Sequence, residues 1–124
     1  MTIEISFGDN VRILRTLETE RLGIAEMIGN VYGETTPSVT KVEVIGELTS
    51  DYAFNVYFDS LDASYWFAPH MLEFVDHAPG TEISVHGSRF KSVRQRDGTW
   101  KDIPVNADER SWFHRLLDKL RRSN

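Results

Sequence analysis

The chain contains no cysteine, which excludes disulfide bonds, thiolate metal ligands and a cysteine nucleophile. It also lacks a long apolar run, and no segment reaches the length that a helix needs to cross a bilayer. The first six residues carry neither a basic segment nor an apolar stretch, so they do not predict a secretory signal. These absences favour a cytoplasmic protein.

Signatures of catalysis are missing as well. The sequence holds no H-E-x-x-H pair, no G-x-S-x-G elbow, no G-x-x-x-x-G-K-[ST] loop and no G-x-G-x-x-G turn. Asp59 and Asp62 form a carboxylate pair, but they fall in an expected turn, where such residues more often cap the chain than catalyse. We therefore expect a protein that is not an enzyme and that carries no cofactor.

The histidines invite a metal-site interpretation. His70 and His77 flank Glu73 and Asp76, and His86 follows. This spacing matches no zinc-finger or zinc-protease pattern. We interpret these side chains as surface or rim histidines and predict no metal site.

Charge is distributed unevenly along the chain. Residues 1–88 carry 4 basic and 14 acidic side chains, a balance of −10, whereas residues 89–124 carry 10 basic and 5 acidic ones, a balance of +5. Such an asymmetry predicts an interaction tail, or a tail that docks on its own acidic body. A solvated charged face without a partner is an equal alternative.

Five short runs in the first part of the chain are typical of β-strands. They cover residues 11–15, 25–32, 39–47, 53–59 and 65–67. The clearest is 53–59, in which Phe54, Val56 and Phe58 alternate with polar neighbours. We expect a loop at 16–23, a bulge or bend at Gly29, a turn at 33–38, and a helical turn with a short closing strand at 71–75. Strands at this spacing predict a small barrel or sandwich.

The order of these signals resembles the small SH3-like barrels of bacterial proteins, including the KOW-type barrels. The resemblance rests on the runs G-D-N-V-R-I from Gly8, G-N-V-Y-G from Gly29, V-Y-F-D from Val56, and W-F-A-P from Trp66, the last leading to L-E-F-V. It covers residues 8–75 and implies a five-stranded SH3-like barrel. Barrels of this kind commonly hold a peptide on an aromatic surface, which the resemblance therefore also implies.

The rest of the chain predicts a hairpin and a helix. Residues 82–103 hold strand-like runs joined by Asp97-Gly98, a strong hairpin signal. Asn106 is a candidate N-cap with Glu109 three residues later, and an apolar stripe follows at Phe113, Leu116, Leu117 and Leu120. We therefore divide the chain into a barrel at 1–78, a β-hairpin extension of the same domain at 79–105, and a C-terminal amphipathic helix at 106–124.

Aromatic residues supply the candidate binding surface. The alternation of the strands predicts that Phe54, Phe58 and Trp66 lie in the core, whereas Tyr57 lies in the opposite phase and faces solvent. An acidic rim, to which Glu34, Asp51, Asp59 and Asp62 belong, would favour a basic or proline-rich ligand. The candidate partner-binding residues are Tyr57, Tyr65, Tyr52, Tyr32, Asp59, Trp112 and Arg115.

The leading hypothesis is a non-enzymatic binding module for a protein or peptide partner. One alternative is an accessory or regulatory subunit that docks through its basic C-terminal hairpin and helix. Another is a nucleic-acid-binding barrel, because residues 89–96 interleave basic residues with an aromatic, although the acidic body would repel a phosphate backbone. Contact of the helix with a membrane surface and self-association are further alternatives.

Overall fold

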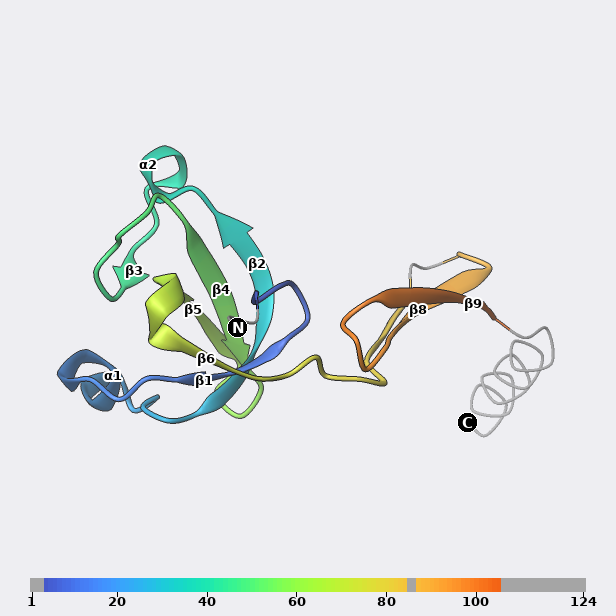
Figure 1. Cartoon of the computed structure of the whole chain (residues 1–124), viewed down its shortest axis with the longest axis horizontal. Coiled ribbons are helices and arrows are strands. Elements are labelled where there is room, and N and C mark those ends of the chain that lie inside the picture. The colour runs from blue at the N-terminus through green and yellow to red at the C-terminus, as the bar shows by residue number, and fades with distance from the viewer. Residues whose placement is uncertain (1–3, 85–86, 106–124) are drawn as a thin grey trace, which may run out of the picture.

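The computed structural model describes residues 4–84 and 87–105, and in this part the chain is mainly β. Its nine strands form a six-stranded sheet and a separate three-stranded sheet (Figure 1). The elements in chain order are β1 (Asn10–Ile13), α1 (Leu17–Leu22), β2 (Ile28–Thr35), α2 (Pro37–Thr40), β3 (Val44–Ile45), β4 (Ala53–Phe58), β5 (Ala63–Phe67), the 3₁₀ turn η1 (Pro69–Met71), β6 (Leu72–Asp76), β7 (Glu82–Ser84), β8 (Phe90–Arg94) and β9 (Trp100–Pro104).

The larger sheet curls into a half-barrel with the strand order β3-β5-β4-β2-β1-β6. The prediction of a helical turn followed by a closing strand is confirmed, because η1 leads into β6, which pairs antiparallel with β1. The core lies inside the curl and includes Val11, Val31, Phe58 and Phe67, all fully buried. The mainly β class is thus confirmed. The six strands of this sheet agree in number with the five strands and the short closing strand that were expected.

The pairing of β4 with β5 decides which aromatic residues enter the core. Phe54 lies opposite Phe67, and Asn55 lies opposite Trp66. Paired residues share a face of the sheet, so Phe67 points inward and Trp66 points outward. The prediction that Phe54 and Phe58 are core residues is confirmed, but the placement of Trp66 in the core is wrong. A run of three aromatics does not reveal its own phase; the partner strand sets it.

The segment 16–23 is not the loop that was predicted, because Leu17–Leu22 form α1 and the residues on either side cap it. Thr16 is the N-cap of α1, and it exchanges two hydrogen bonds with Thr19: each backbone amide donates to the other residue's hydroxyl. Gly23 ends the helix in the left-handed conformation, with φ of 74°. The polar residues and the glycine, which suggested a loop, are the start and stop signals of a short helix.

The expected strand at 39–47 is mostly absent. Pro37 occupies the first turn of α2, where its fixed φ favours a helix, and Lys41 ends that helix with φ of 59°. Only Val44 and Ile45 form a strand, which pairs parallel with Trp66 and Phe67. The turn predicted at 33–38 is likewise replaced, by the end of β2 and the start of α2.

Gly29 and Tyr32 give β2 its shape. The sequence placed a bulge or bend at Gly29, but Gly29 pairs regularly with Val11. Its role is close packing, because a Cβ there would lie 2.5 Å from Val56 Cγ1 and 2.9 Å from Phe58 Cε1. The irregularity lies between Val31 and Gly33 instead, and it leaves Tyr32 as the unpaired residue of a bulge.

The second sheet has the order β7-β8-β9 and contains the predicted hairpin, in which Arg94 pairs with Trp100 across the Asp97-Gly98 turn. The predicted C-terminal helix, with Trp112 and Arg115, lies outside the described residues. In the described part of the chain, no helix has the length and apolar character needed to span a bilayer.

Candidate functional site

Three aromatic side chains gather on the outer face of the half-barrel. Tyr57 and Trp66 leave β4 and β5 on the side opposite the core, as the pairing of these strands shows. Tyr32, turned outward at the bulge, stacks on Tyr57 with ring centroids 4.8 Å apart and planes 13° apart. Tyr32 is 54% exposed, so the stack presents an aromatic surface to solvent. We call Tyr32, Tyr57 and Trp66 the aromatic face.

Asp62 holds the aromatic face in place. The Tyr57 hydroxyl donates to Asp62 Oδ1 at 2.6 Å. This hydrogen bond is the main cause that raises the pKa of Tyr57 to about 12, with desolvation and the charges of Asp62 and Asp59 adding to it. Asp59 and Asp62 both lie in the exposed turn between β4 and β5. Of the acidic rim predicted from the sequence, Asp59 and Asp62 therefore border the stacked tyrosines.

The other predicted tyrosines lie elsewhere. Tyr52 is half-buried against Phe54, edge to face at 5.0 Å, and burial followed by the neighbouring Glu34 raises its pKa to about 12. Tyr65 packs against the core. The structure thus brings together Tyr32, Tyr57 and Asp59 but separates Tyr65 from them, on the other face of β5.

Asp51, the remaining rim residue, has a structural role. Its carboxylate accepts hydrogen bonds from both the backbone amide and the hydroxyl of Ser38. These bonds hold the pKa of Asp51 below its usual range. The contact ties α2 to the start of β4.

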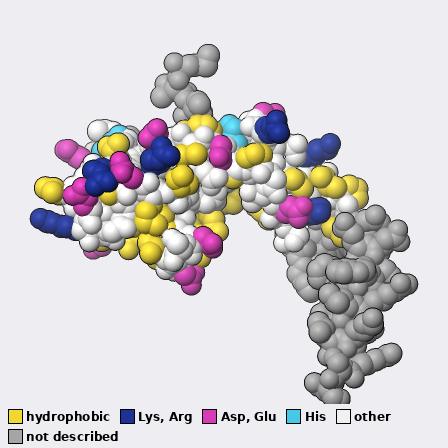
Figure 2. Space-filling view, turned by 90° about the horizontal axis from the view of Figure 1, so that it is seen from below, with side chains coloured by type: hydrophobic (Ala, Val, Ile, Leu, Met, Phe, Trp, Pro, Cys, Tyr) yellow, Lys and Arg dark blue, Asp and Glu magenta, His cyan; other side chains and the backbone are white. Residues whose placement is uncertain are grey.

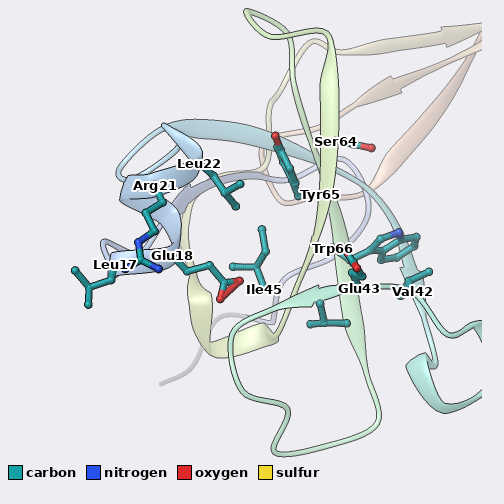
Figure 3. Close-up of a pocket in the computed structure, with 11 residues that line it drawn as sticks. Leu17, Glu18, Arg21, Leu22, Val42, Glu43, Ile45, Ser64, Tyr65 and Trp66 are labelled. Carbon is teal, nitrogen blue, oxygen red and sulfur yellow. The ribbon is translucent and has the colours of Figure 1, made fainter.

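A groove opens between α1 and β5. It has a volume of about 1060 Å³ and is lined by three segments: one face of α1, residues 42–45 with β3, and residues 64–66 of β5. Figure 3 shows Tyr65 reaching from β5 toward Leu22 of α1, with Ile45 beside them, while Ser64 and Trp66 leave β5 on the other side. This groove was not predicted from the sequence, because residues 16–23 were interpreted as a loop, whereas α1 forms one of the groove's walls.

A buried ion cluster joins the two sheets. Asp9 is fully buried and Arg94 is 3% exposed. Asp9 Oδ1 accepts hydrogen bonds from the Arg94 guanidinium and, at 2.7 Å, from His77 Nδ1. Arg94 Nε donates to the His77 carbonyl oxygen at 2.9 Å, and its guanidinium lies 5.1 Å from the centre of the Trp100 ring. The sequence offers no local signal for this cluster, because Asp9 and Arg94 are 85 positions apart.

The cluster and a second ion pair change the interpretation of the basic segment at 89–96. Arg94 is buried and paired with Asp9, and Lys91 pairs with Glu82 at 3.2 Å. Arg89 and Arg96 are exposed. The segment therefore offers fewer solvent-facing cations to a phosphate backbone than its sequence suggests.

The two described histidines discussed above have protein partners. His70 Nε2 lies 2.8 Å from the Glu47 carbonyl oxygen, and His77 contacts Asp9. In residues 4–84 and 87–105, no three histidine, aspartate or glutamate side chains are grouped to hold a metal ion. His86 lies outside the described residues.

Comparison of the chain with protein-family models, with curated proteins and with solved structures finds no match.

Proposed function

We propose that this chain is a non-enzymatic binding module that holds a protein or peptide partner on the aromatic face, and that its half-barrel is of the SH3-like type. The fold proposal is supported by the strand order along residues 8–75 and by the return of β6 to pair with β1. The functional proposal rests on one observation: a stacked, solvent-facing Tyr32–Tyr57 pair that contributes nothing to the buried core.

An exposed pair of aromatic side chains is a candidate contact surface for a partner. Tyrosine and tryptophan give large, rigid contact areas at a low cost in conformational entropy, and they are enriched at the energetic centres of protein interfaces. Tyr57 is further fixed by its hydrogen bond to Asp62, so little ordering remains to be done on binding. The aromatic face is a preorganised contact surface.

The acidic border selects the chemistry of the partner. Asp59 and Asp62 lie in the turn next to Tyr57 and add negative charge to its surroundings. Arginine stacks on aromatic rings and pairs with carboxylates, and extended proline-rich segments lie well in aromatic-lined grooves. The fitting partner is therefore a segment rich in arginine or proline.

The test is a selection of random linear peptides on the immobilised full chain. We expect wild-type protein to enrich peptides with arginine or proline, and the Tyr32→Ser/Tyr57→Ser variant to lose them with little change in melting temperature. Val39→Ser, which removes an exposed apolar side chain on α2, is the matched control and should bind as wild type does. Equal enrichment by wild type and the double variant would refute the proposal.

A second candidate function, an accessory subunit that docks through its C-terminal part, is favoured by the second sheet. Phe90 and Ile83 are both exposed, and their strand pairings place them on the same face of that sheet. Hydrophobic side chains are visible on the surface of both the half-barrel and the second sheet (Figure 2). If this face docks on a larger assembly, Phe90→Ser should abolish recruitment while Tyr32→Ser/Tyr57→Ser leaves it intact.

A further inference from the structure

The groove between α1 and β5 has a free strand edge on one side. Within the described residues, β3 is two residues long and pairs only with Trp66 and Phe67. The first part of β5, residues 63–65, therefore has no neighbouring strand on this edge in that part of the chain. An uncovered edge offers unpaired backbone donors and acceptors that can template another strand.

The backbone of Ser64 points into this groove. The amide of Ala68 donates to the Ile45 carbonyl oxygen at 2.9 Å, so Ala68 directs its backbone groups toward β3. Backbone direction alternates along a strand, which gives Trp66 and Ser64 the same direction and turns Tyr65 toward β4. The N–H and C=O of Ser64 thus face the groove just before the start of β3, since Val44, the first residue of that strand, pairs with Trp66.

Helix α1 presents apolar side chains to the same groove. Its buried residue is Thr19, whereas Leu17 is 73% exposed and Leu22 is 42% exposed. A short helix that buries a threonine and exposes two leucines reverses the usual amphipathic arrangement. Both leucines line the groove, and Figure 3 shows Leu22 facing Tyr65 across it. An apolar wall opposite a free strand edge is the arrangement that receives an extended chain.

We infer that this groove accepts an extended segment of a protein partner, which adds to β5 as a strand at Ser64 and places alternate side chains against Tyr65 and Leu22. The volume of about 1060 Å³ accommodates several residues of such a segment. The charged lining consists of Glu18, Glu43 and Arg21, an acidic excess that favours a lysine or arginine in the partner. This site borders the aromatic face at Trp66 but lies away from the stacked Tyr32 and Tyr57, and it extends the proposed function to a second surface.

The test measures how the peptides selected on the full chain bind to a set of variants, and groups the peptides by the variants that no longer bind them. Ser64→Pro removes the amide donor that faces the groove, and proline is tolerated on an uncovered strand edge. Ser64→Ala, its matched control, removes only the hydroxyl that accepts from Asn55. Leu22→Glu places a charge in the apolar wall. We expect peptides with alternating apolar residues and one basic residue to lose affinity about tenfold or more with Ser64→Pro and with Leu22→Glu, and to keep it with Ser64→Ala and Val39→Ser.

Several results would overturn the inference, and they separate it from the proposed function. Selected peptides that all depend on Tyr32 and Tyr57 but not on Leu22 would support the aromatic face and refute the groove. A wild-type chain that dimerises, with Leu22→Glu restoring the monomer, would assign the groove to a second copy. If Leu116→Glu in the full chain shifts the Ser64 amide resonance, the chain's own C-terminal segment occupies the groove, and a partner segment does not.

Discussion

The buried pair of Asp9 and Arg94 allows a sharp prediction about stability. Replacing Asp9 by Asn leaves the Arg94 guanidinium buried without its counter-charge, because Arg94 is only 3% exposed. Breaking a buried ion pair by removing one partner costs about 3–5 kcal/mol. A domain of this size has a total stability of about 5–15 kcal/mol, so the variant loses a large part of it. At roughly 4 °C per kcal/mol, the melting temperature should fall by about 12–20 °C.

The measurement is urea unfolding of wild type, Asp9→Asn, Arg94→Met and the double variant. If the two side chains stabilise the fold as a pair, the double variant should be markedly less destabilised than the sum of the single variants. The exposed pair of Arg12 and Glu73, 3.8 Å apart, supplies the control: Glu73→Gln should cost less than about 1 kcal/mol. A cost below about 1 kcal/mol for Asp9→Asn, or additive single costs, would refute the reasoning.

Hydrogen exchange adds a spatial test of the same cluster. Arg94 belongs to β8 and Asp9 lies directly before β1, so the pair joins the second sheet to the half-barrel. In Asp9→Asn, the amides of Lys91 and Val93 should lose protection before the amides of β4 do. Equal loss in both sheets would show that the cluster stabilises the chain as one unit.

Three further predictions concern the half-barrel. Asp62→Asn should move the pKa of Tyr57 from about 12 toward its ordinary 10.0, which an ultraviolet titration would record as one tyrosine that ionises at lower pH. Because folding raises the pKa of Tyr57, the hydrogen bond to Asp62 stabilises the fold fully below pH 10, and this stabilisation is lost as the pH rises through about 12. No change in that titration would contradict the assigned bond. Gly29→Ala should cost about 1–3 kcal/mol in chemical unfolding because its Cβ would overlap Val56, whereas Gly33→Ala, with its nearest atom 4.0 Å away, should cost far less; equal costs would disprove the packing argument. Thr16→Ala should cost about 1 kcal/mol through loss of the N-cap of α1, and an unchanged unfolding midpoint would count against that cap.

The sequence predicted best where a signal is local and repeated. The alternation of Phe54, Val56 and Phe58 identified β4 and its inward face, and Asp97-Gly98 identified the hairpin. The aromatic face was partly predicted in the same way, since Tyr57 lies out of phase with these core residues. Tyr32 joins it from β2, where it follows the buried Val31 and so lies on the outer face.

The failures share a physical cause, which is that distant pairing or packing decides the outcome. Trp66 and Tyr65 exchanged their expected faces because the register with β4 sets the phase of β5. The strand expected at 39–47 lost its first two residues to α2, where the fixed φ of Pro37 favours a helix. Of the remainder, only Val44 and Ile45 pair as a strand. Asp9 and Arg94 find each other only in the folded chain, so a turn residue and a basic strand residue carried no sign of their pairing.

The groove shows how one local error hides a site. Interpreting residues 16–23 as a loop removed α1, and with it the wall that carries Leu17 and Leu22. The reciprocal Thr16–Thr19 cap and the glycine at position 23 were the available signals. A helix of six residues is too short to show a clear hydrophobic periodicity, so its capping residues are the better signal for where it begins and ends.

The central claim, that the aromatic face binds a partner segment, is tested most directly by mapping one selected arginine- or proline-rich peptide onto the full chain by NMR. The account predicts that the peptide shifts the Trp66 indole resonance and the amides of Tyr32 and Tyr57, while the amides of β8 and β9 stay in place. Shifts confined to the second sheet, with Tyr32, Tyr57 and Trp66 unmoved, would contradict it.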